Sequence, residues 1–294
     1  MRGIFLLIGI CILVFLYLWN TRKQILLPVS RRLQPNFPVN VLVCGIGHNV
    51  AHAIPGLKRG LMNTLKHFHD YRMFWYENDS TDDTRELMNE WAAEDSRVRI
   101  LSEVKDRGSA IDARPDGEFL GDFTSYLADY RNMYLDELQK PIYRDFQYVW
   151  ILDMDLEHGF PKEPILELMA KRDEWDMVAA NGLMGGYSYD SLAFRDAVFP
   201  DGPPEMGEAK YWHWPDVAQR KGYMHNVREE WHPVISAFGG MAMYKRKSIT
   251  GCRYQGKVGG VPECEHVPFN RCVRGKKFVY RNWTPVKGSH GYHA

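Results

Sequence analysis

Two aspartates spaced one residue apart, Asp153 and Asp155, close the apolar run Phe146-Gln-Tyr-Val-Trp-Ile-Leu-Asp-Met-Asp155. The β-branched and aromatic residues before Asp153 predict a buried strand. Side chains alternate along a strand, so both carboxylates are expected on one side, where they repel each other unless a cation lies between them. This Asp-x-Asp motif therefore predicts a site for a hard divalent ion, whereas the same triplet in a surface loop would be solvated and idle.

A second candidate lies at the end of the apolar run Val39-Asn-Val-Leu-Val-Cys-Gly-Ile-Gly47. Glycine lets a backbone approach a ligand closely, and a strand that ends in glycines at the start of an α/β sheet often cradles a nucleotide. Gly45 is therefore a candidate for nucleotide binding. An ordinary tight turn explains the same residues equally well.

Polar groups gather after the short aromatic strand predicted at Tyr71–Tyr76. Glu77 is the first residue past that strand and can accept hydrogen bonds from a ribose or a base, and Asp79 follows it closely. Thr81 and Asp82 are better explained as caps of the helix that comes next.

A predicted helix, residues 123–138, carries Arg131 and Asn132. An arginine can clamp a phosphate through two parallel hydrogen bonds, so Arg131 is a candidate for donor binding and catalysis. The alternative, which spacing alone favours, is an ordinary surface salt bridge.

Alternating strands and helices must position these groups. Strands are predicted at residues 39–47, 71–76, 98–101, 146–155, 176–180 and 236–244, and helices at residues 54–69, 85–94, 123–138 and 163–172. This alternation is typical of an α/β fold, in which ligands bind at the carboxyl ends of the strands.

Length and composition limit the possible functions. The 294 residues suit one α/β domain with a short appendage. Lysine plus arginine equals aspartate plus glutamate, 37 of each, so no basic field favours a nucleic-acid partner. Among five cysteines, Cys252, Cys264 and Cys272 are close enough in sequence for one disulfide, and whether they pair depends on the compartment.

The N-terminus predicts a membrane anchor. Gly3 to Trp19 is apolar and uncharged, which places an uncleaved transmembrane signal-anchor at residues 1–20 and a proline-containing stem at residues 21–38. The positive charges that follow, beginning with Arg22 and Lys23, favour a cytoplasmic domain, so both membrane orientations stay open.

Several motifs in this order resemble a nucleotide-sugar-dependent glycosyltransferase of the GT-A fold. They are Cys44-Gly-Ile-Gly47, Tyr76-Glu-Asn-Asp-Ser-Thr-Asp-Asp-Thr84, Tyr130-Arg-Asn132, Trp150-Ile-Leu-Asp-Met-Asp155, Tyr189-Asp-Ser-Leu-Ala-Phe-Arg-Asp196, Ser236-Ala-Phe-Gly-Gly-Met-Ala-Met-Tyr244 and Glu263-Cys-Glu-His-Val267. More narrowly, the chain is similar to fungal capsule-associated α-1,3-mannosyltransferases, and more distantly to yeast Golgi α-mannosyltransferase subunits. The resemblance covers most of residues 39–286.

This resemblance implies a single catalytic domain, residues 39–294, built on a Rossmann-like mixed sheet flanked by helices. Its nucleoside would be held by Gly45, Glu77 and Asp79, with Arg131 and Asn132 near the donor. Asp153 and Asp155 would face the metal and the diphosphate.

Two further roles follow from the same resemblance. A histidine from the C-terminal part completes the metal site in many such folds, and His266 is the first choice here, before His290 and His225. Glu265 would be the general base if the reaction inverts the anomeric carbon, and would only bind sugar if the reaction retains its configuration.

The predicted function is metal-dependent transfer of a hexose, with mannose from GDP-mannose favoured over a UDP-linked sugar, to a glycan or glycoprotein acceptor. Mn²⁺ or Mg²⁺ is the expected cofactor. The expected location is a single-pass, type II membrane protein of the Golgi or ER, with a cytoplasm-facing orientation left open. Aromatic residues between 182 and 219 and the glycines Gly239 and Gly240 would suit the acceptor sugar, although a packing loop and a β-bulge explain them as well.

Two other classes of protein are considered. A nucleotidyltransferase would usually carry a lysine in its first phosphate loop, which Gly45-Ile-Gly-His-Asn49 lacks. A non-catalytic, membrane-anchored carbohydrate-binding subunit would need neither nucleotide nor metal. The sequons at Asn78 and Asn282 bear on the compartment, and a glycan on Asn78 would crowd the predicted donor pocket.

Overall fold

The computed structural model describes residues 37–105, 120–184, 187–188, 190–201, 222–224 and 229–285. All of them belong to one compact unit, Phe37–Ala294. The predicted anchor, residues 1–20, and nearly all of the predicted stem lie outside the described residues. Among the helices that are described, none has the length and apolar character needed to cross a bilayer.

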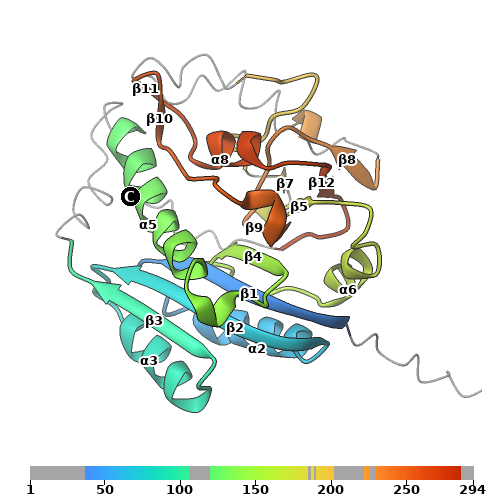
Figure 1. The fold of residues 1–294 in the computed structure, drawn as a ribbon. Helices are drawn as coiled ribbons and strands as arrows, with labels where there is room; N and C mark the ends of the chain where they lie inside the picture. The colour runs from blue at the N-terminus through green and yellow to red at the C-terminus, as the bar shows by residue number, and fades with distance from the viewer. Residues whose placement is uncertain are drawn as a thin grey trace, which may run out of the picture. The chain divides into compact units, whose positions relative to one another are not determined.

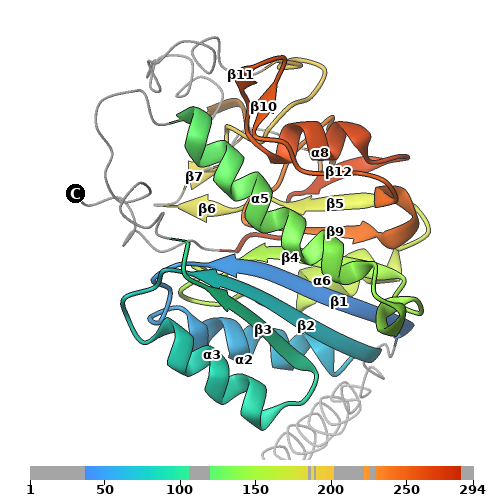
Figure 2. The same ribbon diagram turned by 60° about the vertical axis from the view of Figure 1, so that its left-hand side comes forward.

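A mixed sheet of eight strands forms the centre of the unit (Figures 1 and 2). Its spatial order is β3 (Val98–Glu103), β2 (Phe68–Asn78), β1 (Phe37–Gly47), β4 (Tyr148–Asp153), β9 (Met241–Lys245), β5 (Met177–Ala180), β12 (Lys277–Tyr280) and β8 (Trp231–Pro233). Neighbours pair in parallel except that β9 is antiparallel to both β4 and β5, and β8 is antiparallel to β12. The predicted α/β class with a mixed sheet is therefore confirmed.

Helices cover both faces of this sheet, because its strands are apolar on both sides. Along β1, Val41 and Val43 face a core shared with α2 (Ile54–Leu65), α3 (Thr84–Glu94) and α6 (Glu163–Ala170). The alternate residues Leu42 and Cys44 face a second core shared with α5 (Leu120–Leu138) and α8 (His266–Cys272). Figure 2 shows α5 running across the second face, with α2 and α3 on the other side of the sheet.

Smaller elements complete the described part of the chain. They are the two-stranded pairs β6 (Leu183–Met184) with β7 (Tyr187–Ser188) and β10 (Lys257–Val258) with β11 (Val261–Pro262), and the 3-10 turns η1 (Pro141–Tyr143) and η3 (Arg246–Ile249).

One predicted helix boundary is wrong by several residues. The helix predicted over residues 54–69 ends at Leu65, and β2 already begins at Phe68. Phe68 pairs with Phe37 at the start of β1, and the two ring centroids lie 5.7 Å apart. Phe68 and His69, which helical spacing assigned to the helix, therefore belong to the sheet.

The carboxyl ends of the parallel strands meet at one edge of the sheet. Gly47, Asn78, Asp153 and Ala180 end β1, β2, β4 and β5 there. The antiparallel strand β9 begins at the same edge, after a turn in which Gly239 and Gly240 have φ of 61° and 81°. Only glycine adopts these angles without strain, and the turn brings the Gly240 carbonyl to 2.9 Å from the Asp153 backbone nitrogen.

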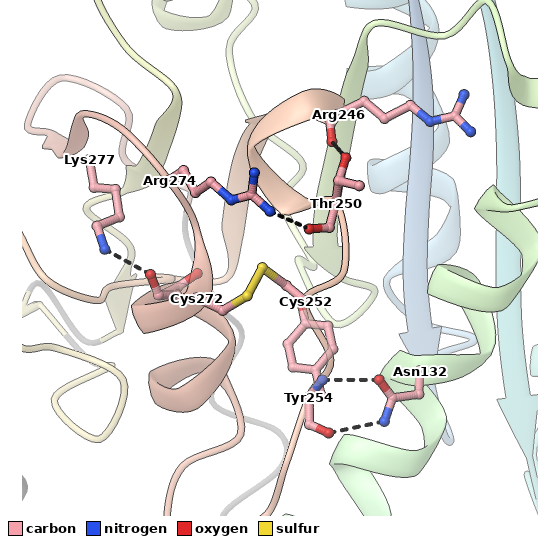
Figure 3. The surroundings of a disulfide bond; sticks show 9 residues. Asn132, Arg246, Thr250, Cys252, Tyr254, Cys272, Arg274 and Lys277 are labelled. Carbon is pink, nitrogen blue, oxygen red and sulfur yellow. Dashed lines mark hydrogen bonds between the residues drawn. A yellow bond between two sulfur atoms is a disulfide. The ribbon is translucent and has the colours of Figure 1, made fainter.

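A disulfide joins Cys252 to Cys272, with 5.6 Å between the two Cα atoms (Figure 3). It settles which of the three candidate cysteines pair, because Cys264 is a buried thiol, like Cys44. The closed segment spans 20 residues and contains the whole stretch from Glu263 to His266. Closing a loop of this length restricts the unfolded chain, which stabilises the fold by about 3 kcal/mol.

Candidate active site

A buried arginine joins two carboxylates at the carboxyl edge of the sheet. Arg131, on α5, donates from Nε to Glu265 Oε1 at 2.8 Å and from Nη2 to Asp153 Oδ1 at 2.9 Å. The side chains of Arg131 and Glu265 are each 4% exposed and that of Asp153 is 19% exposed. The alternative of a surface salt bridge is therefore wrong for Arg131.

Packing encloses this cluster. The Phe238 ring lies 5.0 Å from the Arg131 guanidinium, and His266 stacks on Phe238 with ring centroids 3.8 Å apart. Burial by itself would lower the pKa of Arg131, but Tyr134, Asp153 and Glu265 raise it well above its usual value, so the guanidinium stays charged. Removing one partner of such a buried ion pair typically costs about 3–5 kcal/mol, because the other charge is left uncompensated.

The Asp-x-Asp pair lies where β4 ends. Asp153 is the last residue of the strand, so strand alternation does not extend to Asp155, contrary to the basis of the prediction. Both residues are nevertheless half-buried, and the Asp155 carbonyl accepts from the Glu157 backbone N–H at 3.0 Å in the turn that follows. A carboxylate has two oxygens, so Asp153 can accept from Arg131 through one and bind a cation through the other.

Oxygen donors of this kind fit Mg²⁺ or Mn²⁺. Such ions are usually held by one or two carboxylates together with substrate phosphates and water, without a closed protein cage. Within the described ranges, no three histidine, cysteine, aspartate or glutamate side chains gather as a metal-binding group. The two aspartates would therefore share the ion with the diphosphate of a bound nucleotide.

His266 is not placed with the two aspartates. It is 3% exposed and packed between Phe238 and Tyr254, with its Nε2 3.5 Å from Glu265 Oε1. Burial and the charge of Arg131 lower the pKa of His266 well below its usual value. The geometry gives His266 a packing role, and the reserve candidates His225 and His290 lie outside the described residues.

Glu265 is placed differently from the base that the sequence suggested. A general base must reach the acceptor hydroxyl within hydrogen-bond distance. The Glu265 carboxylate is buried and bound to Arg131, so in this conformation an acceptor cannot reach it. The structure gives Glu265 the role of fixing Arg131.

Glu77 has no exposed surface, and its carboxylate oxygens accept hydrogen bonds from residues in and around the loop between β2 and α3. Oε1 accepts from the Ser80 backbone N–H at 2.7 Å, while Oε2 accepts from Arg85 Nε at 2.8 Å and from the Ser102 hydroxyl. Burial alone would raise the pKa of Glu77, but these hydrogen bonds hold it below its usual value. Glu77 therefore shapes the loop beside the predicted nucleoside pocket and does not face that pocket.

The other predicted nucleotide-binding residues, Gly45, Asp79 and Asn132, have structural roles within the protein. Gly45 is buried, and a Cβ there would lie 3.0 Å from both Met154 and Trp75, so core packing leaves little room for a larger residue. Asp79 is half-buried, with φ of 54°, and its Oδ1 accepts from the Lys105 backbone N–H at 2.8 Å. Asn132 exchanges two hydrogen bonds of 3.0 Å with the Tyr254 backbone, which ties α5 to the segment beside the disulfide (Figure 3).

Two residues that the sequence analysis did not single out hold this edge together. His48 Nδ1 lies 2.8 Å from the Asn78 carbonyl, and Asn49, with φ of 52°, accepts from the Thr81 backbone N–H at 2.8 Å. The Asn49 backbone N–H donates to the Ser80 hydroxyl at 3.1 Å. The available signal was an asparagine, which tolerates a left-handed backbone, two residues after Gly47.

Comparisons with known proteins found one family whose model matches the chain. The model of the family described as Cryptococcal mannosyltransferase 1 matches residues 40–271. No curated protein matches the chain.

Two solved structures align in part with this chain. The mannosyltransferase PcManGT from Pyrobaculum calidifontis, in complex with GDP-Man and Mn²⁺, aligns over 95% of this chain and 66% of its own, with a TM-score of 0.48 and 14% identity. S. aureus TarS 1-349, in complex with UDP-GlcNAc, aligns over 87% of this chain and 62% of its own, with a TM-score of 0.44 and 11% identity. The chain thus spans slightly less than two thirds of the length of each.

The family match begins within β1 and ends within α8, so it covers most of the chain and every residue of the Arg131 cluster. The protein therefore belongs to the family described as Cryptococcal mannosyltransferase 1.

Proposed function

We propose that the protein transfers mannose from GDP-mannose to a glycan acceptor with the help of Mn²⁺ or Mg²⁺. The observation that carries the proposal is the buried Arg131, which binds Asp153 at the carboxyl end of β4 through Nη2 and Glu265 through Nε. Mannose is favoured by the description of the family.

Each residue of the site has a distinct task in this proposal. Asp153 and Asp155 would hold the divalent ion and, through it, the diphosphate. When bound there, the ion would neutralise the negative charge that develops on the departing nucleoside diphosphate. Arg131 holds Asp153 in place before substrate arrives, so that the carboxylate does not have to be reoriented during the reaction.

A panel of nucleotide sugars tests this function. With Mn²⁺ present, we expect the full-length protein to hydrolyse GDP-mannose slowly without an acceptor. This hydrolysis should stop when EDTA removes the ion. Calorimetry on the same samples measures nucleotide binding. Binding of mannosides without any nucleotide would instead support the carbohydrate-binding subunit, and pyrophosphate release from GTP and mannose 1-phosphate would support the nucleotidyltransferase.

We further propose that residues 1–20 anchor the protein and that its domain faces the lumen of the ER or Golgi. The Cys252–Cys272 disulfide supports this orientation, because disulfides persist in the secretory pathway and are rare in the cytosol.

The two sequons give a measurement of orientation. Asn282 is exposed, whereas Asn78 is 3% exposed and donates to Asp79 Oδ2 at 2.8 Å, which leaves no room for a glycan. For a luminal domain expressed in eukaryotic cells, we expect mass spectrometry to find a glycan on Asn282 and none on Asn78, with Asn282→Gln as the control. A glycan on neither site, together with reduced Cys252 and Cys272, would indicate the cytoplasmic orientation.

A further inference from the structure

A pocket lies beside the Arg131 cluster and takes no part in the donor and metal roles described above. Its enclosed volume is only about 20 Å³, so a ligand bound here would lie largely in the open mouth of the pocket. Its walls combine apolar groups, among them Phe194 and Phe238, with the polar side chains of Asp190, Glu229 and His232. Aromatic surface with a few polar groups around it suits a sugar, whose ring has an apolar face and whose edge carries hydroxyls.

This pocket shares a wall with the predicted metal site. Phe238 lines the pocket and also lies 5.0 Å from the Arg131 guanidinium. Gly239 lines it too, and the next residue, Gly240, accepts from the Asp153 backbone N–H at 2.9 Å. A molecule in the pocket would therefore lie next to the end of β4, where a bound donor would present its sugar.

His232 is held in one orientation. Its Nε2 lies 2.8 Å from Asp196 Oδ2, which also accepts from the Tyr223 hydroxyl at 2.8 Å. The other oxygen of Asp196 accepts from the backbone N–H groups of Val198 and Phe199, each at 2.8 Å. Since a carboxylate only accepts, Nε2 must carry a proton, and in the tautomer protonated at Nε2 alone Nδ1 is an acceptor.

His232 lines the pocket, and its second ring nitrogen, Nδ1, is not the one that contacts Asp196. Nδ1 is buried and has no hydrogen-bond partner within the described part of the chain. The nearest carboxylate is that of Glu229, 3.6 Å away, which is beyond hydrogen-bond distance; this side chain is 67% exposed and also lines the pocket. A ligand hydroxyl can take the place of the Glu229 carboxylate beside Nδ1.

We infer that this pocket is the subsite for the acceptor hexose, and that His232, oriented by Asp196, accepts a hydrogen bond from an acceptor hydroxyl through Nδ1. The inference rests on the proposed function, because it assigns a place to that reaction's second substrate. His232 contacts substrate in this account, and Asp196 acts through His232 as a positioning residue.

Kinetics with two substrates test the inference. Full-length protein is assayed with GDP-mannose, Mn²⁺ and methyl α-D-mannopyranoside as acceptor, as wild type, His232→Gln and Asp196→Asn. We expect the KM for the acceptor to rise at least tenfold in both variants, while the KM for GDP-mannose stays within twofold. His69→Gln is the matched control, because His69 is exposed at the start of β2, on the opposite edge of the sheet.

Direct binding separates this inference from the proposed function. Saturation-transfer NMR measures the binding of methyl α-D-mannopyranoside to the protein in the absence of nucleotide. Melting temperatures identify any variant that fails to fold. Loss of mannoside binding in folded His232→Gln supports the subsite even if GDP-mannose is not the donor. An unchanged acceptor KM and unchanged mannoside binding in this variant, or equal rises in the KM of both substrates, would overturn it.

Discussion

Replacement of Asp155 by alanine is expected to abolish sugar transfer while leaving the fold intact. The side chain is half-buried in the turn after β4, outside the two hydrophobic cores, so its removal leaves no apolar cavity. The variant would lose one of two carboxylate ligands for the ion that stabilises the leaving diphosphate. Several kcal/mol of transition-state stabilisation depend on such an ion, so we expect about a thousandfold lower kcat/KM for GDP-mannose.

The assay compares initial rates of wild type, Asp155→Ala and Asp173→Ala over a range of Mn²⁺ concentrations. Asp173 is an exposed aspartate after α6 and serves as a control for loss of one negative charge. The circular dichroism spectra and melting temperatures of all three proteins should agree. An Asp155→Ala enzyme that retains metal-dependent activity would contradict the assignment of this residue.

Arg131→Met is expected to damage both stability and activity. Methionine fills part of the same volume but leaves the buried Glu265 carboxylate without its counterion, so the free energy of unfolding should fall by about 3–5 kcal/mol. Asp153 would also lose the donor that fixes it. We expect transfer by the folded fraction to fall at least about a hundredfold, the size of effect seen when one preorganised charge contact is removed.

A double variant separates the two effects of this substitution. In Arg131→Met/Glu265→Leu no buried charge is left unpaired, and replacing a buried ion pair by apolar residues is often neutral for stability. Urea denaturation should therefore show stability close to that of the wild type, while transfer remains low because Asp153 is still unfixed. A single Arg131→Met variant with wild-type stability and rate would show that the cluster has neither role.

The sequence predicted the larger elements well and the short ones poorly. Apolar runs bounded by glycine or charge located β1 and β4, because strands buried on both faces are nearly continuously hydrophobic. The strand expected from Ser236 begins only at Met241, since Gly239 and Gly240 form a left-handed turn before it. β12 has only four residues and β8 only three, too few for any periodicity to be recognised.

Predicting the site was harder because its residues come from distant parts of the chain. Asp153 was found from the Asp-x-Asp motif that ends an apolar run. Glu265, however, is 134 residues from Arg131, and no local spacing in the sequence predicts their ion pair. Gly45 and Glu77 were placed correctly at the carboxyl edge of the sheet. Their roles there could not be read from the sequence, since burial decides whether a polar or small residue faces a ligand or the protein.

The most direct test of the account is a calorimetric titration of Mn²⁺ into the full-length protein, with and without saturating GDP. Since the two aspartates share the ion with a diphosphate, we expect weak binding alone and binding at least about tenfold tighter with GDP. Asp153→Ala and Asp155→Ala should each lose the GDP-dependent binding, whereas His266→Phe should keep it. Unchanged Mn²⁺ affinity in both aspartate variants, or loss of binding only in His266→Phe, would contradict the account.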